Sequence, residues 1–239
     1  TEASDLEWDY TVSWVDVTAT GRGLGKGLVL RGRFNDVADG TLSRPAPVPR
    51  VRVPFEAPSW LLSKPTIRLF NTAWYAKQFT PHRTRSVDLE PFFYPLDAVG
   101  QWNLLYGKRG MLQYQCVIPP HDAVATMEHI LRTMQAGGIS SFLAVVKTFG
   151  TIVSPGMLSF PRPGTTLALD FPNRGEATLH LLSELDKVVL AAGGAVYPAK
   201  DARMPAEVFA ASFPRLAEFR AFLDPRFSSG LWRRVGGNA

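Results

Sequence analysis

Cysteine and metal-ligand patterns are what this sequence lacks most clearly. Cys116 is the single cysteine in 239 residues, which excludes an internal disulfide and any zinc site built from several thiolates. The four histidines show no HExxH or comparable spacing, so no metal site is expected. A GxSxG motif and an ordered Ser/His/Asp set are also missing, which leaves nucleophilic catalysis without support.

Long apolar runs and blocks of one charge are missing as well. No stretch approaches the length of a membrane span, and the N-terminus has no signal-peptide pattern, which predicts a soluble protein of the cytoplasm or periplasm. The net charge is +5, but lysine and arginine are scattered along the chain. This charge suits small anionic ligands as well as nucleic acid, and without a basic stripe we expect no nucleic-acid partner.

The order of apolar patterns in the second half of the chain predicts an α+β fold. Alternation with a period of two marks strands at 112–118, 142–149, 165–171 and, more briefly, 195–197. Helical periodicity predicts helices at 122–137 and 176–192. This order is typical of a ferredoxin-like βαββα core, an antiparallel sheet with helices on one face, to which a helical C-terminal segment is added.

The first half of the chain is interpreted from its turn and breaker residues. The strand pattern of residues 6–17 leads into a glycine-rich stretch, 21–27, which is either a phosphate cradle or a hairpin connection. The hairpin is favoured because neither a dinucleotide fingerprint nor a P-loop is present. Prolines predict an extended connection over 40–58, residues 60–79 are expected to form short helices, and 80–90 to form a loop.

Two of the predicted strands carry polar side chains on an apolar face. Gln113 and Gln115 share one face of the first strand. The corresponding face of the second strand is made of Leu143, Val145, Lys147 and Phe149. Polar tips on an apolar wall are typical of a small-molecule site, but a half-solvated sheet face gives the same pattern and is preferred from the residues alone.

Five runs of residues carry more information, because together they resemble one protein family. They are MLQYQCVIP (111–119), SFLAVVKTFG (141–150), LSFPRPG (158–164), LALDFP (167–172) and GGAVYPAKDAR (193–203). With weaker agreement towards both ends, they resemble the C-terminal half of FAD-linked oxidases of the vanillyl-alcohol oxidase superfamily. Within that superfamily, the likeness is greatest to sugar oxidases that act on decaprenylphosphoryl-ribose.

This resemblance implies an FAD-dependent oxidoreductase acting on CH–OH donors, which moves a hydride from a secondary alcohol of a sugar to the flavin. In such enzymes an FAD-binding domain precedes the matching region. Residues 1–194 would then be a substrate-binding (cap) domain, and residues 195–239 a segment that packs on the FAD-binding domain. The chain alone is expected to hold FAD weakly and to be inactive, and a reductase subunit is a further expected partner.

The resemblance also implies roles for individual residues. Lys200 would act beside the flavin as a base or as a cation for the developing alkoxide, and Tyr197 would touch the flavin. The implied substrate pocket consists of Trp14, Phe93, Gln113, Gln115, Leu143, Val145, Lys147 and Phe149. Three positions that are often cysteine, asparagine and tyrosine in the decaprenylphosphoryl-ribose enzymes are Ala168, Thr166 and Phe93 here, so a different alcohol substrate stays open.

Two other functions stay open beside this one. An FAD-linked sugar-lactone oxidase of the same superfamily would share the fold and the cofactor but act on a different substrate. A free-standing module that binds anionic sugars or RNA would need no catalytic residue, and would show steeply salt-dependent binding to nucleic acid.

Overall fold

A six-stranded sheet forms the centre of the computed structural model, which describes residues 7–34, 51–76, 78, 80–200 and 203–236. The strand order is β2-β1-β6-β7-β5-β8, and each neighbouring pair is antiparallel. The strands are β1 (Tyr10–Val15), β2 (Gly27–Gly32), β5 (Met111–Ile118), β6 (Leu143–Phe149), β7 (Gly164–Pro172) and β8 (Ala195–Val196). A short parallel pair, β3 (Val51–Arg52) and β4 (Val99–Gly100), forms a second sheet.

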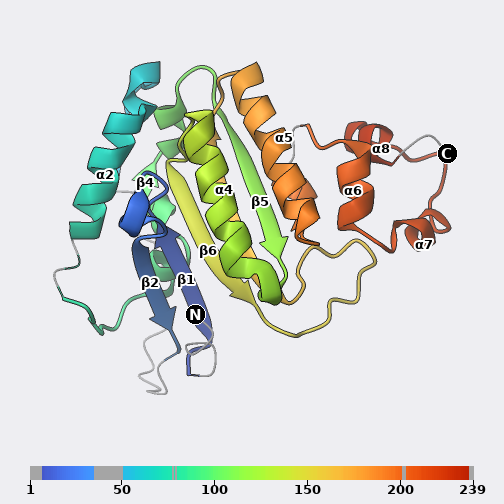
Figure 1. Cartoon of the computed structure of the whole chain (residues 1–239), viewed down its shortest axis with the longest axis horizontal. Helices are drawn as coiled ribbons and strands as arrows, with labels where there is room; N and C mark the ends of the chain where they lie inside the picture. The colour runs from blue at the N-terminus through green and yellow to red at the C-terminus, as the bar shows by residue number, and fades with distance from the viewer. Residues whose placement is uncertain (1–6, 35–50, 77, 79, 201–202, 237–239) are drawn as a thin grey trace.

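Helices α4 (Ala123–Gly137) and α5 (Glu176–Ala191) lie side by side over one face of the main sheet (Figure 1). Chain order β5-α4-β6-β7-α5-β8 and spatial order β6-β7-β5-β8 together make the ferredoxin-like core that the sequence predicts. The hairpin of β1 and β2 extends this core at the β6 edge. The glycine-rich stretch is the connection of that hairpin, as expected, and contains the short turn Gly21–Gly23.

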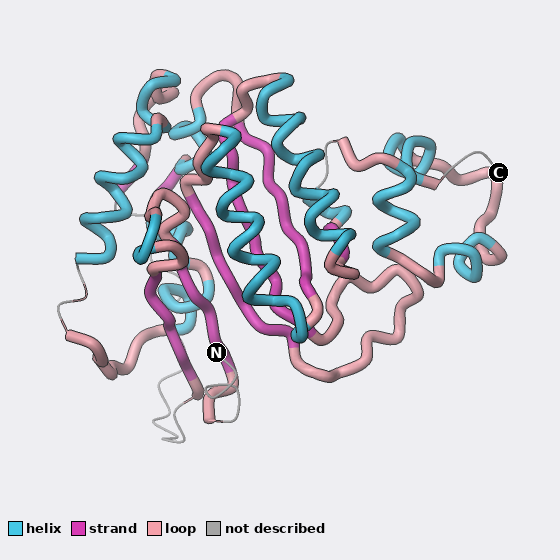
Figure 2. The backbone as a smooth tube through the Cα atoms, in the orientation of Figure 1, coloured by secondary structure: helices cyan, strands magenta, loops and turns pink. Residues whose placement is uncertain are grey.

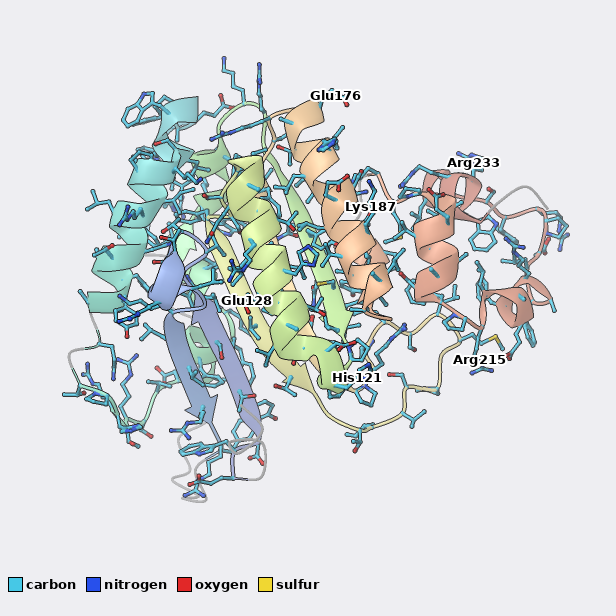
Figure 3. The ribbon with its side chains drawn as sticks, in the orientation of Figure 1. His121, Glu128, Glu176, Lys187, Arg215 and Arg233 are labelled. Atoms are coloured by element: carbon cyan, nitrogen blue, oxygen red, sulfur yellow. The ribbon has the colours of Figure 1, made fainter. Side chains whose placement is uncertain are left out.

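The main core lies between the sheet and these two helices. Side chains of β5 and β7 alternate between the two faces, and those facing the helices are apolar: Tyr114, Cys116, Ile118, Leu167, Leu169 and Phe171. They meet Ile130 and Met134 of α4 and Leu185 of α5, all at most 3% exposed. Charged side chains such as Glu128 and Lys187 lie on the outer sides of the same helices, paired with neighbours on the same helix (Figure 3).

Shorter elements surround this core. They are α2 (Lys64–Ala76), α3 (Leu89–Phe93) and the C-terminal helices α6 (Ala206–Ser212), α7 (Leu216–Arg220) and α8 (Gly230–Val235). The connection 150–163 between β6 and β7 contains no helix or strand and runs towards α6 (Figure 2). Phe209 and Val235 bury their side chains in the same core cluster as the sheet residues, so α6 and α8 pack on this core.

Two of the expectations from sequence concern the connecting segments 40–58 and 80–90. The proline-rich connection at 40–58 lies outside the described residues up to position 50, and β3 begins directly after that point. The loop expected at 80–90 has no helix or strand until α3 begins at Leu89. Within the described part of the chain, no helix combines the length and the apolar character needed to cross a bilayer.

Candidate functional site

The face of the sheet that α4 and α5 leave uncovered, here called the open face, brings most of the predicted pocket residues together. Directly opposed residues of antiparallel strands point to the same side. One row across the sheet is Gln113, Asp170 and Leu143, and the next is Gln115, Ala168, Val145 and Trp14. Lys147 follows beside Thr166. The open face therefore combines two amides and a lysine with an apolar wall.

Two polar pairs lie in the middle of the open face. Nε2 of Gln113 donates to Oδ1 of Asp170 at 2.9 Å, and Nε2 of Gln115 donates to Oγ1 of Thr166 at 3.1 Å. Asp170 is 4% exposed and Thr166 is 2% exposed, whereas the glutamines are only half-buried. The strand β7 thus supplies buried hydrogen-bond partners for the more accessible amides of β5.

Asp170 is the electrostatic centre of this group. Burial raises the pKa of its carboxyl, while the hydrogen bond from Gln113 and the charge of Lys200 lower it, the burial effect being the larger. Burial, together with the nearby charge of Asp170, also raises the pKa of the Tyr106 phenol, which comes from the turn at Trp102–Tyr106. Among the residues that the structure describes, Oδ2 of Asp170 and the Tyr106 hydroxyl have no hydrogen-bond partner.

A groove at the edge of β5 brings Lys200 to the same place. Gln113, Gln115, Tyr197 and Lys200 line it on one side, and Tyr114 together with Leu182 and Asp186 of α5 lines it on the other. Lys200 lies in the turn Pro198–Lys200, which begins directly after Tyr197. The backbone N–H of Tyr197 donates to the carbonyl of Gln115 at 2.8 Å. β5 contains both glutamines and, through this hydrogen bond, fixes the residue before the turn. The geometry of β5 therefore sets the position of Lys200 relative to the two amides.

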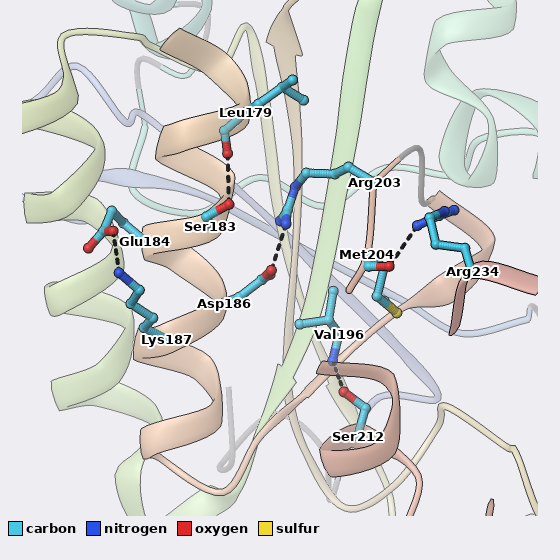
Figure 4. A network of polar contacts seen from close by, with 10 residues as sticks. All are labelled: Leu179, Ser183, Glu184, Asp186, Lys187, Val196, Arg203, Met204, Ser212 and Arg234. Atoms are coloured by element: carbon cyan, nitrogen blue, oxygen red, sulfur yellow. Dashed lines mark hydrogen bonds and ion pairs between the residues drawn. The ribbon is translucent and has the colours of Figure 1, made fainter. Parts of the chain in front are cut away.

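The lysine turn is anchored on both sides, as Figure 4 shows. Before it, the N–H of Val196 donates to the hydroxyl of Ser212 at 3.1 Å. After it, Arg203 forms a 2.7 Å ion pair with Asp186 of α5, in which both side chains are largely buried. Arg234 of α8 then donates to the carbonyl of Met204 at 2.7 Å. The turn is therefore held by α5, α6 and α8 together.

The aromatic residues fall into two groups. Phe149 packs edge to face on Phe160, whose ring stacks on Tyr197 with centroids 4.5 Å apart. This places Phe149 and Tyr197 around one aromatic centre beside the groove. Phe93 instead packs edge to face on Tyr10 of β1, with centroids 4.9 Å apart.

Sequence reasoning missed Asp170, Tyr106 and the pair of Asp186 and Arg203. Asp170 does lie in the LALDFP run, where a carboxylate inside an apolar strand was a usable signal. Asp186 likewise interrupts the apolar stripe of α5. Within the described residues, no group of three or more His, Cys, Asp or Glu side chains could hold a metal ion.

Comparison with known proteins adds evidence from sequence. No protein-family model matches this chain. The chain is 36% identical over 253 residues to decaprenylphosphoryl-beta-D-ribose oxidase of Mycolicibacterium smegmatis, an alignment that covers 98% of this chain and 52% of the relative. It is 31% identical over 251 residues to an uncharacterized protein of Streptomyces coelicolor, covering 98% and 67% of the two chains. The chain therefore spans about half the length of the first relative and two thirds of the second.

Proposed function

Because this chain belongs to the family of FAD-linked oxidases, we propose that it forms the substrate-binding part of an enzyme that oxidises a secondary alcohol of a sugar. The observation that carries the proposal is the meeting of Gln113, Gln115 and Lys200 in one groove at the β5 edge of the sheet, which Leu182 and Asp186 of α5 also line. The substrate class is a sugar linked to a polyprenyl phosphate, by analogy with the substrate in the name of the Mycolicibacterium smegmatis relative.

The open face supports binding of such a sugar in three ways. The half-buried amides of Gln113 and Gln115 line the groove and bind hydroxyl groups of the sugar. Leu143, Val145 and Trp14 form an apolar wall that excludes water from the reacting carbon. Lys147 is exposed at the margin of this wall, where it suits a phosphate oxygen.

Lys200 is proposed as the catalytic residue. FAD supplies the hydride acceptor when it is bound. Loss of the hydride must be accompanied by loss of the hydroxyl proton of the substrate. Lys200 either accepts this proton as a base or, as an ammonium, stabilises the alkoxide that develops on the substrate. The stacked ring of Tyr197 offers a flat aromatic contact for the flavin directly beside this lysine.

The residues described here suit contact with the flavin ring of FAD better than binding of its phosphate groups. The glycine-rich turn at Gly21–Gly23 joins two antiparallel strands and does not lead from a strand into a helix, as a dinucleotide cradle does. We therefore propose that another domain of the complete protein binds most of the FAD, and that residues 195–239 pack on it. A separate reductase subunit as the electron acceptor belongs to the same proposal.

The decisive experiment is stopped-flow reduction of the complete flavoprotein by a polyprenylphosphoryl sugar. Lys200→Ala is expected to slow flavin reduction by roughly 10²–10⁴-fold while the flavin spectrum and the circular dichroism stay unchanged. Lys187→Ala is the matched control, because Lys187 lies on the outer side of α5 in an exposed pair with Glu184. Unaltered flavin reduction in Lys200→Ala would rule out the catalytic role of Lys200. Faster flavin reduction by sugar lactones than by the polyprenylphosphoryl sugar would favour a sugar-lactone oxidase instead.

A further inference from the structure

We propose that Asp170 is a positioning residue that fixes the side-chain amide of Gln113, so that the amide oxygen faces the groove and selects a substrate hydroxyl that donates a hydrogen bond. The ligand that would be selected rests on the proposed function, whereas the orientation of the amide follows from this chain alone. Asp170 itself is buried opposite Gln113 on the neighbouring strand and is not expected to touch the substrate.

The chemistry of a carboxylate makes this orientation one-sided. An ionised carboxylate has only acceptor atoms, so the group of Gln113 that lies 2.9 Å from Oδ1 of Asp170 must be the NH₂ group. The amide oxygen then points away from Asp170, and Gln113 lines the groove. An amide oxygen in that place accepts from a hydroxyl but cannot satisfy an ether, a keto group or a fluorine.

Gln115 provides an internal comparison. Its Nε2 donates to the Thr166 hydroxyl, which can act as donor or acceptor. If the amide of Gln115 turned round, the threonine hydroxyl could donate to its oxygen and no hydrogen bond would be lost. Of the two glutamines, only Gln113 has its donor and acceptor ends distinguished by a charged neighbour.

The position of Asp170 is rigid, which makes it suitable for this role. Its backbone N–H donates to the Ser141 hydroxyl at 2.9 Å, and its carbonyl accepts from the N–H of Phe142 at 3.1 Å. Besides the neutral amide of Gln113, two titratable groups act on the carboxyl of Asp170. Lys200 favours its ionised form, and the Tyr106 phenol lies within electrostatic range. When the carboxyl is protonated it becomes a donor as well, and the constraint on Gln113 is lost.

The first test follows two side chains of this chain within the complete flavoprotein. Side-chain amide signals of Gln113 and Gln115 are assigned by NMR with Gln113→Leu and Gln115→Leu variants and then followed against pH. The Gln113 signals are expected to shift as Asp170 titrates, with a midpoint above that of an exposed carboxyl, and to lose this titration in Asp170→Asn. The Gln115 signals are the matched control and should stay constant. If the chemical shifts of the Gln113 amide change neither with pH nor in Asp170→Asn, the proposal is overturned.

The second test measures selection in the complete flavoprotein. The probes are farnesylphosphoryl-ribose and its analogues in which one hydroxyl at a time is replaced by fluorine, which cannot donate. One analogue should bind the unaltered protein about tenfold more weakly, and this difference should shrink in Asp170→Asn, because an Asn–Gln pair can form in either orientation.

The outcomes separate this inference from the proposed function. A tenfold difference that persists unchanged in Asp170→Asn would contradict the role of Asp170 while supporting a sugar site. If neither the parent sugar nor its analogues bind, the proposed function fails, and the NMR titration alone decides the orientation of Gln113.

Discussion

The two faces of the sheet use the same strands for opposite purposes. On the face covered by α4 and α5, the side chains of β5 and β7 are apolar and almost fully buried. On the open face, their immediate neighbours in sequence are Gln113, Gln115, Thr166 and Asp170. Since consecutive residues of a strand point to opposite sides, a shift of one position along the strand moves a side chain from the core to the open face. The buried apolar contacts are therefore concentrated on the first face, and the residues proposed to bind substrate lie on the second.

Two buried aspartates sharpen this contrast. Asp186, on α5, has its charge balanced by Arg203 at 2.7 Å. Asp170, on the open face, accepts a hydrogen bond from the neutral amide of Gln113, and burial raises the pKa of its carboxyl. The ion pair of Asp186 suits a structural anchor, whereas the carboxyl of Asp170 is paired with an amide that lines the groove.

The largest expected effect comes from breaking the structural ion pair. Arg203→Met leaves the carboxylate of Asp186 buried without its cation and should lower the free energy of unfolding by about 3–5 kcal/mol. Urea unfolding followed by circular dichroism measures this change. Arg132→Met, which removes an exposed pair with Glu128 on α4, should cost at most about 1 kcal/mol. Similar losses in the two variants would contradict the structural role of Arg203.

A second pair of variants compares the faces directly. Leu185→Ala opens a cavity on the covered face, where Leu185 is 0% exposed, and should cost about 2–5 kcal/mol. Val145→Ala removes a half-buried side chain from the open face and should cost about 1 kcal/mol. Equal denaturation midpoints for the two variants would show that the open face contributes as much to stability as the core.

The pH dependence of stability should separate Asp170 from an ordinary carboxyl. Its pKa is raised in the folded protein, so folding favours the protonated form. This contribution is complete below the pKa of the unfolded carboxyl and is lost as the pH rises through the folded pKa. Asp170→Asn should therefore gain stability relative to the unaltered chain as the pH rises towards neutrality, as urea unfolding at a series of pH values can show. A gain that appears only towards acid pH would reverse the sign and refute this assignment.

The smallest effect concerns Cys116 on the covered face. Burial raises the pKa of its thiol to about 12, so the folded protein should react very slowly with Ellman's reagent at pH 8. Reactivity should appear together with the unfolding transition in urea. Rapid labelling without urea would show that the covered face opens locally.

Much of the fold was predictable because periodicity is a local property. The period of two in residues 112–118 and the glycines near 137 and 193 are enough to place β5, α4 and α5. The same period correctly put Gln113 and Gln115 on one side of their strand. The family followed from runs of residues whose order is specific.

The polar contacts of the site could not be predicted in the same way. Periodicity says which side a residue faces but not which strand lies beside it, and β7 enters between β6 and β5 only in the folded sheet. Asp170 is 57 residues from Gln113 along the chain, so nothing local indicates their hydrogen bond. The burial of Asp170 and its interaction with Tyr106 and Lys200 also depend on segments that approach from three parts of the chain.

The sequence by itself determined the strands, the helices, the apolar sides that form the core and membership of the FAD-linked oxidase family. These follow from short-range order, in which each residue constrains its neighbours within one or two turns. Only the tertiary structure decided that Asp170 supports Gln113, that Lys200 joins the same groove and that Arg203 anchors it. The physical reason is that hydrogen bonds and charges act over a few ångströms in space, whatever the distance along the chain.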